Sequence, residues 1–382
     1  MALLRLQRRV QALTLTERRQ YARHLRIDDV GSVGQSRLRA SRVLVVGAGG
    51  LGAPVIMYLA AAGIGTIGIV DDDAVELSNL QRQVIHSVRS IGASKTASAA
   101  QFIDGLNPSI EVITYELRVS PENILDIIAD YDVVVDATDN FSTRYVVNDA
   151  CVLLKKPCVW GSVFQFSGQV SVFWSEIGPC YRCFFPEPPP AEYAPSCAEG
   201  GVVGAVCGAV GSMQALEVIK IVTGAGEPIC GRVVMIDALS GSMSQMSIPR
   251  VDECPACGDR ESLGILPIPT TSCVIVEEAV PTVTATELQD LIQTEAVDAI
   301  AILDVRNDWE WDEGRIPGAI FVGPTWEENP MLPNDVREVI LYCQSGVRSK
   351  RALLSALDSG ITARHLDGGM NAWIASTRME VK

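Results

Sequence analysis

The chain has 382 residues, 48% of them hydrophobic, and a formal net charge of −15. This length exceeds what one ordinary hydrophobic core organises, so we expect two domains. The acidic balance argues against a nucleic-acid-binding surface, which requires a basic face.

The number of cysteines and the nature of the apolar segments indicate the cellular compartment of the protein. The eleven cysteines are an odd number, and the opening residues are charged and helix-like, without the apolar core of a secretory signal. We therefore expect a cytoplasmic protein whose cysteines serve as thiols or metal ligands. The uncharged run between Arg42 and Asp71 is long enough for a membrane span, but seven glycines and Pro54 interrupt it. It is better interpreted as a β–α–β unit, so no membrane association is predicted.

Apolar strands alternate with helices in the first two thirds of the chain. Residues 43–46 and 66–70 are predicted strands on either side of a glycine turn and a helix, and "YDVVVDATDN" contains another strand. Continuously apolar strands separated by helices are typical of a parallel sheet that is covered on both faces. The segment 157–174 is predicted to form paired strands, and 204–224 a small-residue helix that ends at a glycine.

Prolines mark a boundary between about 249 and 281. We place the first domain at 1–260, a linker at 261–280 and a second domain at 281–382. In the second domain the strands "AIAILDVR" and "EVILYC" alternate with helical sequence. The fold class is therefore α/β: a Rossmann-like domain with a parallel-rich sheet, followed by a smaller α/β domain.

A glycine-rich loop directly follows the first strand and opens a helix. Its sequence "GAGGLG" fits G-x-G-x-x-G through Gly47, Gly49, Gly50 and Gly52. Glycines let the backbone turn tightly and approach phosphates, and the helix N-terminus favours their charge. Asp71 closes the next strand, where a ribose-binding acid is expected. Taken alone, these residues would also suit an NAD oxidoreductase or a tight packing turn.

The residues beyond Asp71 favour a triphosphate. The polar candidates in "ELSNLQRQ" and "IGASK" are Asn79, Arg82, Gln83 and Lys95. Two cations near a phosphate loop suit a triphosphate better than a dinucleotide. Asp139 and Asn140 end another parallel strand, at the edge where ligands bind in open α/β sheets. A carboxylate there can hold Mg²⁺.

Together, "YARHL", "GAGGLG", "VDDDAVELSNLQRQ", Lys95 and "DATDN" resemble the MoeB/ThiF-type sulfur-carrier adenylyltransferases, relatives of ubiquitin-activating enzymes, over about 15–258. The resemblance implies that Asp139 holds magnesium. It also implies that Arg23 reaches the ATP of a partner subunit in a homodimer. The implied ATP-lining residues are Gly50, Asp71, Ser78, Asn79, Leu80, Gln81, Arg82, Lys95, Asp139 and Asn140.

The family reaction is adenylation of the C-terminal Gly-Gly of a ubiquitin-like sulfur carrier. The terminal carboxylate attacks the α-phosphorus of ATP and expels pyrophosphate. Arg23, Arg82, Lys95 and Mg²⁺ would screen the two anions and stabilise the transition state. A carboxylate nucleophile needs no general base, which agrees with a chain that has three histidines.

Two C-x-x-C pairs suggest a Cys₄ zinc site formed by Cys180, Cys183, Cys254 and Cys257. Their wide separation leaves redox pairs or chance open from the residues alone. The family resemblance implies a shared structural zinc. It also implies that Cys197, in a Pro- and Gly-flanked segment, attacks the activated carrier or resolves the sulfur intermediate. The remaining cysteines are predicted to be packing residues: Cys151, Cys158, Cys207, Cys230 and Cys273.

A second loop, "CQSGVR", joins a predicted strand to a helix. Its amides, the helix dipole and Arg348 are expected to stabilise negative charge on the Cys343 sulfur. A cysteine phosphatase has a similar loop, but with five residues between its cysteine and arginine. Here four residues separate Cys343 from Arg348, which suits a sulfane sulfur better than a phosphate. The segments "AILDVRNDWEWDEGRIPGAI" and "LDGGMNAW" resemble the rhodanese family over about 281–378, with Arg315 where that family usually has histidine. The resemblance implies a Cys343 persulfide, while Asp304 and Arg306 are interpreted as scaffold.

The whole chain thus resembles adenylyltransferase–sulfurtransferase fusions that serve molybdopterin synthesis and tRNA thiolation. It implies ATP, Mg²⁺ and Zn²⁺, and a carrier that leaves as a thiocarboxylate. The sulfane-sulfur donor would be thiosulfate or a cysteine-desulfurase persulfide. Two alternatives stay open: an activating enzyme for ubiquitin-like conjugation with a regulatory rhodanese domain, and a non-catalytic carrier-binding scaffold.

Overall fold

The computed structural model of the chain describes residues 10–187, 201–258, 280–293, 300–332 and 336–377. The chain divides into two compact units, 1–272 and 273–382. The predicted linker lies almost entirely outside the described residues, so its boundaries stay predictions.

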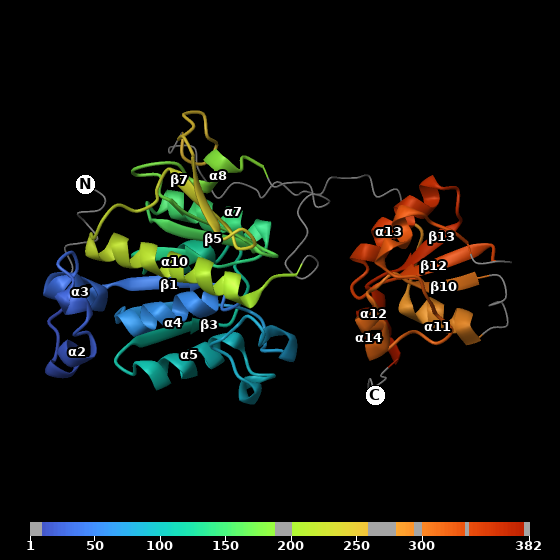
Figure 1. Cartoon of the computed structure of the whole chain (residues 1–382), viewed down its shortest axis with the longest axis horizontal. Helices are drawn as coiled ribbons and strands as arrows, with labels where there is room; N and C mark the ends of the chain where they lie inside the picture. Colours follow the sequence, from blue (N-terminus) through green and yellow to red (C-terminus); the bar gives the residue numbers. More distant parts are fainter. Residues whose placement is uncertain (1–9, 188–200, 259–279, 294–299, 333–335, 378–382) are drawn as a thin grey trace. The chain divides into compact units, whose positions relative to one another are not determined.

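An eight-stranded sheet forms the first unit, in the order β3-β2-β1-β4-β5-β6-β7-β8 (Figure 1). The neighbours from β3 to β5 pair in parallel, and β6, β7 and β8 extend the sheet in antiparallel fashion. This order confirms the predicted Rossmann-like class. The strands are β1 (Arg42–Val46), β2 (Thr66–Val70), β3 (Glu111–Tyr115), β4 (Val133–Asp136), β5 (Cys158–Phe164), β6 (Ser167–Phe173), β7 (Arg232–Asp237) and β8 (Ser242–Ser247).

Helices cover both faces of this sheet. They are α2 (Leu15–Gln20), α3 (Gly31–Ala40), α4 (Gly52–Ala62), α5 (Lys95–Leu106), α6 (Ile124–Ala129), α7 (Phe141–Leu153), α8 (Tyr181–Phe184) and α10 (Gly204–Thr223), with the 3₁₀ turns η1 (His24–Arg26), η2 (Leu77–Asn79) and η3 (Val88–Ser90). Successive side chains of a strand face opposite sides. Accordingly Val43 and Val45 pack with α3, α4, α5 and α10, whereas Leu44 and Val46 pack with α6 and α7.

The helix α10 lies beside α4 on one face of the sheet (Figure 1). It is the one helix among the described residues that is long and apolar enough to cross a membrane, and it is largely buried in the protein. A Cβ atom at Gly211 would lie 2.4 Å from the Pro54 side chain, so glycine permits this close helix contact. The predicted end of the helix is confirmed, because Gly224 caps it in the left-handed conformation.

A five-stranded parallel sheet, in the order β11-β10-β12-β13-β9, forms the second unit. Apolar clusters cover both of its faces. Its elements are β9 (Thr282–Val283), α11 (Ala285–Gln293), β10 (Ile300–Asp304), α12 (Asp308–Glu313), β11 (Ile320–Phe321), η6 (Pro324–Glu328), β12 (Glu338–Tyr342), α13 (Val347–Asp358), β13 (Ala363–Leu366) and α14 (Gly369–Thr377).

Candidate functional sites

A cavity of about 390 Å³ lies at the carboxyl edge of β1, β2 and β4. This is the edge at which ligands bind in open parallel sheets. The structure brings together most of the predicted nucleotide residues here: Gly47, Gly49, Gly50, Asp71, Asn79, Arg82, Lys95, Asp139 and Asn140 all line the cavity.

The glycine loop is fixed by contacts that only small residues allow. Gly47 has a φ of 96°, and a Cβ atom at Gly52 would lie 1.9 Å from the carbonyl oxygen of Gly47. Asp71 braces the loop, since its carboxylate accepts hydrogen bonds from the backbone amides of Ala48 at 2.7 Å and Asp73 at 3.0 Å. Burial raises the pKa of Asp71, and the nearby Lys95 acts in the opposite direction. The loop and its acid are therefore held together before any ligand arrives.

Lys95 is buried at the start of α5. Its Nζ lies 2.6 Å from an Asp73 carboxylate oxygen and 4.0 Å from one of Asp71. Arg82 instead donates a hydrogen bond to the carbonyl oxygen of Ser78 at 3.1 Å. The two predicted cations thus have different partners, and Arg82 is paired with no carboxylate among the ion pairs of the described residues.

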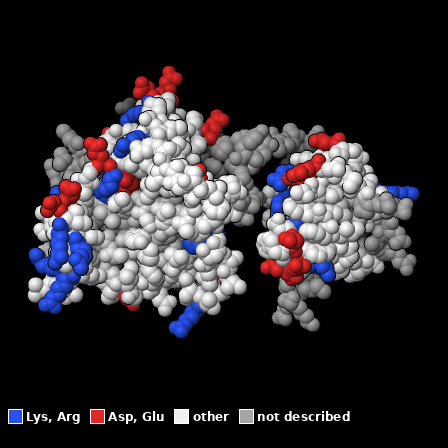
Figure 2. Space-filling view, in the orientation of Figure 1, with Lys and Arg blue, Asp and Glu red and all other residues white. Residues whose placement is uncertain are grey.

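Five predicted nucleotide residues are not among those lining the cavity: Gly52, Ser78, Leu80, Gln81 and Arg23. Gly52 allows the close approach of the loop, and Ser78 positions Arg82 through its backbone. Arg23 is exposed next to η1. Figure 2 shows basic side chains gathered over α2 and α3, which contribute Arg18 and Arg37, among others.

The sequence analysis missed several lining residues. Two are cations, Arg118 after β3 and Arg144 in the first turn of α7. Cys207, predicted to be a packing residue, is buried but also lines the cavity, and a Cβ atom at Gly50 would lie 3.1 Å from its Sγ. The signal for Arg144 was present, because it follows "DATDN" by one helical turn.

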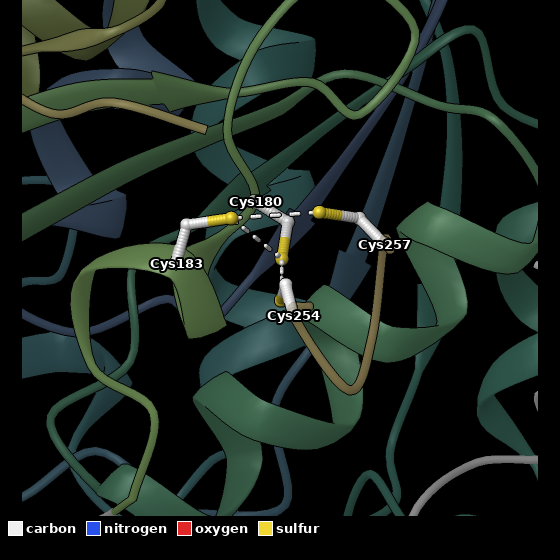
Figure 3. A group of neighbouring side chains, drawn as sticks. All are labelled: Cys180, Cys183, Cys254 and Cys257. Atoms are coloured by element: carbon white, nitrogen blue, oxygen red, sulfur yellow. Dashed lines mark hydrogen bonds between the residues drawn. The ribbon is translucent and has the colours of Figure 1, made fainter. Parts of the chain in front are cut away.

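The four predicted zinc ligands converge (Figure 3). The Sγ atom of Cys180 lies 4.0 Å from the Sγ of Cys183 and 3.6 Å from the Sγ of Cys254. The Sγ atoms of Cys183 and Cys257 are 3.4 Å apart. A tetrahedral zinc with Zn–S distances of about 2.3 Å requires sulfurs about 3.8 Å apart. The donor set and its spacing therefore fit zinc.

The segment 180–183, which carries the first two cysteines and is here called the zinc turn, is hydrogen-bonded to α7. Arg182, between the first two cysteines, donates two hydrogen bonds of 2.8 Å to the carboxylate of Asp149 on α7, and both side chains are almost fully buried. The amide of Tyr181 donates to the side chain of Asn148 at 2.7 Å. The end of α7 distant from the cavity is thus attached to the cysteine cluster.

Cys343 lies directly after β12 and is buried. The backbone amide of Gly346, which has a φ of 93°, donates a hydrogen bond to its Sγ at 3.2 Å. Arg348, at the start of α13, forms hydrogen bonds of 2.7 and 2.6 Å with the two carboxylate oxygens of Glu310. This pairing raises the pKa of Arg348, with a further contribution from Cys343. Glu310 was missed by the sequence analysis.

The scaffold around the Cys343 loop is also polar. Arg306 forms a buried ion pair with Asp304 at 2.7 Å and donates to the side chain of Gln344 at 3.1 Å. Gln344 in turn donates to Asn371 at 2.7 Å. Arg315 stacks on the ring of Trp311, 4.6 Å from its centroid. Cys197 and Cys273 lie outside the described residues.

The two sites define a class of protein that joins a nucleotide-binding Rossmann-like domain to a sulfurtransferase-like cysteine loop. The ThiF family matches residues 21–256, and the rhodanese-like domain matches 284–376. The chain therefore belongs to the ThiF family and carries a C-terminal rhodanese-like domain. This confirms both resemblances predicted from the sequence.

The relatives unite the same two parts. The probable adenylyltransferase/sulfurtransferase MoeZ of Mycobacterium tuberculosis is 45% identical over 376 residues, which are 95% of this chain and 94% of that protein. Adenylyltransferase and sulfurtransferase MOCS3-1 of Zea mays is 38% identical, over 92% of this chain and 80% of its own length. The chain is accordingly an enzyme with adenylyltransferase and sulfurtransferase domains.

Two further comparisons concern the first unit. The sulfur carrier protein adenylyltransferase of Thermus thermophilus is 48% identical over 251 residues, 64% of this chain and 93% of that protein. A crystal structure of E. coli MccB superposes with a TM-score of 0.57 and 23% identity, over 63% of this chain and 75% of that one. At that identity the likeness shows the fold alone.

Proposed function

We propose that the first unit adenylates the C-terminal Gly-Gly of a ubiquitin-like sulfur carrier, and that a Cys343 persulfide then supplies sulfur for a carrier thiocarboxylate. The observation that carries this proposal is the presence, in one chain, of a cation-lined cavity behind a glycine loop and a cysteine loop with an amide on its sulfur. Neither an NAD oxidoreductase nor a binding scaffold needs both.

In the first step a carboxylate oxygen of the carrier attacks the α-phosphorus of ATP. The bond from the α-phosphorus to the bridging oxygen breaks, and pyrophosphate leaves. The glycine-loop amides and the cations Arg82 and Lys95 would hold the phosphates, and Asp71 would bind the ribose hydroxyls. Asp139 would hold Mg²⁺, which neutralises phosphate charge when bound.

In the second step the terminal sulfur of the Cys343 persulfide attacks the acyl carbon, and AMP leaves. The product is an acyl disulfide joined to Cys343. A second thiolate then attacks the Cys343 sulfur, releasing the thiocarboxylate and leaving a disulfide that an external dithiol reduces. Cys197 or an external thiol is the candidate for that attack. The Gly346 amide and Arg348 would stabilise the sulfur anions.

Further roles belong to the same proposal. The four cysteines would hold a structural zinc, since a closed Cys₄ site has no open coordination position. Arg23, exposed and absent from the lining of its own cavity, fits a contribution to a second subunit in a homodimer. We further propose a cytoplasmic enzyme that takes sulfur from thiosulfate or a cysteine-desulfurase persulfide and serves molybdopterin synthesis or tRNA thiolation.

Intact mass spectrometry of the carrier tests this function. A Gly-Gly-terminated carrier is incubated with the enzyme, Mg-ATP and thiosulfate. We expect a mass change that corresponds to oxygen replaced by sulfur, lost in Cys343→Ala while carrier-dependent ATP–pyrophosphate exchange persists. A Cys197→Ala variant shows whether Cys197 is needed to release the carrier thiocarboxylate from Cys343. Adenylation without sulfur transfer in the native enzyme would support the conjugation alternative, and no adenylation of any Gly-Gly carrier would refute the proposal.

A further inference from the structure

Arg144 is a buried cation in the wall of the nucleotide cavity. It is 6% exposed, and its Nε has no hydrogen-bond partner in the part of the chain that the structure describes. One Nη donates to the carbonyl oxygen of Thr138 at 3.0 Å and to the Ser162 hydroxyl at 3.5 Å. None of the ion pairs found among the described residues includes Arg144.

A buried charge without an ionic partner is costly, so proteins pair such groups or offer them to a ligand. The charge of Arg144 acts on the buried Asp136, whose carboxylate accepts hydrogen bonds from the Thr138 amide and hydroxyl. Burial raises the pKa of Asp136 although Arg144 acts to lower it. Within the described residues Arg144 therefore interacts with a buried acid but forms no salt bridge, unlike Lys95 of the same cavity.

The guanidinium of Arg144 is held in place by aromatic rings. Its carbon lies 5.1 Å from the centroid of Phe141 and 5.7 Å from that of Trp160. Trp160 packs in turn on Tyr181, in the zinc turn, at 5.7 Å. Because the side chain is fixed before a ligand arrives, little reorganisation is needed when it meets an anion.

The strand order indicates which anion of the reaction Arg144 would bind. Asp71 follows β2, the glycine loop follows β1, and Arg144 follows β4 with its guanidinium at Ser162 of β5. These strands are neighbours in the order β2-β1-β4-β5, so Arg144 lies on the side of the phosphate loop opposite to the ribose acid. In the proposed function the glycine loop and Asp71 hold the nucleotide at β1 and β2, and Asp139 after β4 holds Mg²⁺ beside the phosphates. The guanidinium of Arg144, at Ser162 of β5, lies beyond these groups and is available for the second anion of the reaction.

We propose that Arg144 binds the terminal carboxylate of the carrier and holds it beside the α-phosphate. This inference rests on the proposed adenylation of a carrier. The guanidinium donates to one carboxylate oxygen, and the other oxygen attacks phosphorus. Charge-assisted hydrogen bonds of this kind are short and directional, so they orient as well as attract.

The test compares Arg144→Gln with Arg118→Gln, because Arg118 lines the same cavity but is exposed and follows β3 at the other side. ATP binding is measured at equilibrium, and carrier dependence by ATP–pyrophosphate exchange. For Arg144→Gln we expect the carrier kcat/KM to fall roughly 10- to 100-fold, the value of a hydrogen bond to a charge, with ATP affinity unchanged. Arg118→Gln weakens ATP binding only, and Arg144→Lys restores part of the loss.

A second readout does not depend on turnover. The native enzyme should bind a Gly-Gly carrier more tightly than the same carrier with an amidated C-terminus, and Arg144→Gln should abolish this preference. Retention of the preference, or a parallel loss of ATP affinity in both Arg144 variants, overturns the inference. Zinc content and the melting temperature report folding, and if Arg144→Gln does not fold, the lysine variant decides. Failure of the native enzyme to adenylate any carrier refutes instead the function on which the inference rests.

Discussion

The nucleotide cavity and the Cys343 loop are both built where a parallel strand turns into a helix. Residues 47–52 join β1 to α4, and residues 343–346 join β12 to α13. They differ in the origin of their charges. The cavity takes cations from four separate segments: Arg82, Lys95, Arg118 and Arg144. The cysteine loop has one paired arginine, Arg348, fixed by one carboxylate.

This difference follows from the size of the ligand. A triphosphate and a carboxylate together extend over several strands, so no single loop can reach all of their charges. A sulfur atom needs only the amides of its own loop and one guanidinium. Ligand binding in the cavity should therefore be lost when the close packing of the glycine loop is disturbed. Sulfur transfer at the cysteine loop should instead fall when the single Glu310–Arg348 ion pair is broken.

The largest effect is expected from Gly52→Ala. The added Cβ atom would lie 1.9 Å from the carbonyl oxygen of Gly47, so the phosphate loop must move. We expect ATP binding and adenylation to be lost and the first unit to be destabilised by about 1–3 kcal/mol, as for overpacking. Isothermal titration with ATP measures the first effect, and the loading of Cys343 with sulfur from thiosulfate, measured without carrier, should be unchanged.

The matched control for that change is Gly49→Ala. Its Cβ atom would approach only the Gln83 side chain, at 3.7 Å, which is an ordinary contact. ATP binding should therefore fall much less than in Gly52→Ala. Equal losses in the two variants would show that loop packing does not govern the cavity.

A smaller effect is expected in the second unit from Glu310→Gln. Glutamine can retain the cap that Glu310 forms on α12 with Asn307, but it loses the charge that holds Arg348. We expect sulfur transfer from thiosulfate to fall by up to about 100-fold, the cost of a misplaced catalytic group, with adenylation unchanged.

Glu327→Gln is the control for Glu310→Gln, since Glu327 pairs with Arg351 on the exposed side of the same helix α13. It should leave the rate of sulfur transfer unchanged. A rate in Glu310→Gln equal to that of the native enzyme would mean that Arg348 does not need its carboxylate partner.

The sequence predicted the parts of both sites that are local in the chain. The glycine loop, Asp71 and the loop from Cys343 to Arg348 are short patterns beside apolar strands. Glu310 escaped detection because its contact with Arg348 spans 38 residues, and nothing in either segment points to the other. Arg144 follows "DATDN" by one helical turn, but its burial against Trp160 of β5 left no local pattern in the sequence.

Local sequence patterns also limit how much of the fold can be predicted. The strands 43–46 and 66–70 were predicted because they are almost continuously apolar and buried. The strand β8 was not predicted, because "SMSQMS" has no apolar pattern and is exposed at every position. Only its antiparallel pairing with β7 makes it a strand. Backbone pairing at an edge leaves no signal in hydrophobic periodicity.

The smallest expected effect concerns the pH dependence of the Glu310–Arg348 pair. Burial acts to raise the pKa of Glu310, but the hydrogen bonds from Arg348 and Asn307 and the charge of Arg348 together outweigh burial, and the pKa falls below its ordinary value of 4.5. A carboxyl group of this kind adds stability above its unfolded pKa and loses it as the pH falls towards the folded one. The difference in unfolding free energy between the native enzyme and Glu310→Gln should therefore be constant near neutrality and shrink below about pH 4.5. Denaturant unfolding followed at a series of pH values measures this difference. A difference that grows on acidification would mean that Glu310 is not stabilised as a carboxylate, and that the single cation of the cysteine loop is held by other contacts.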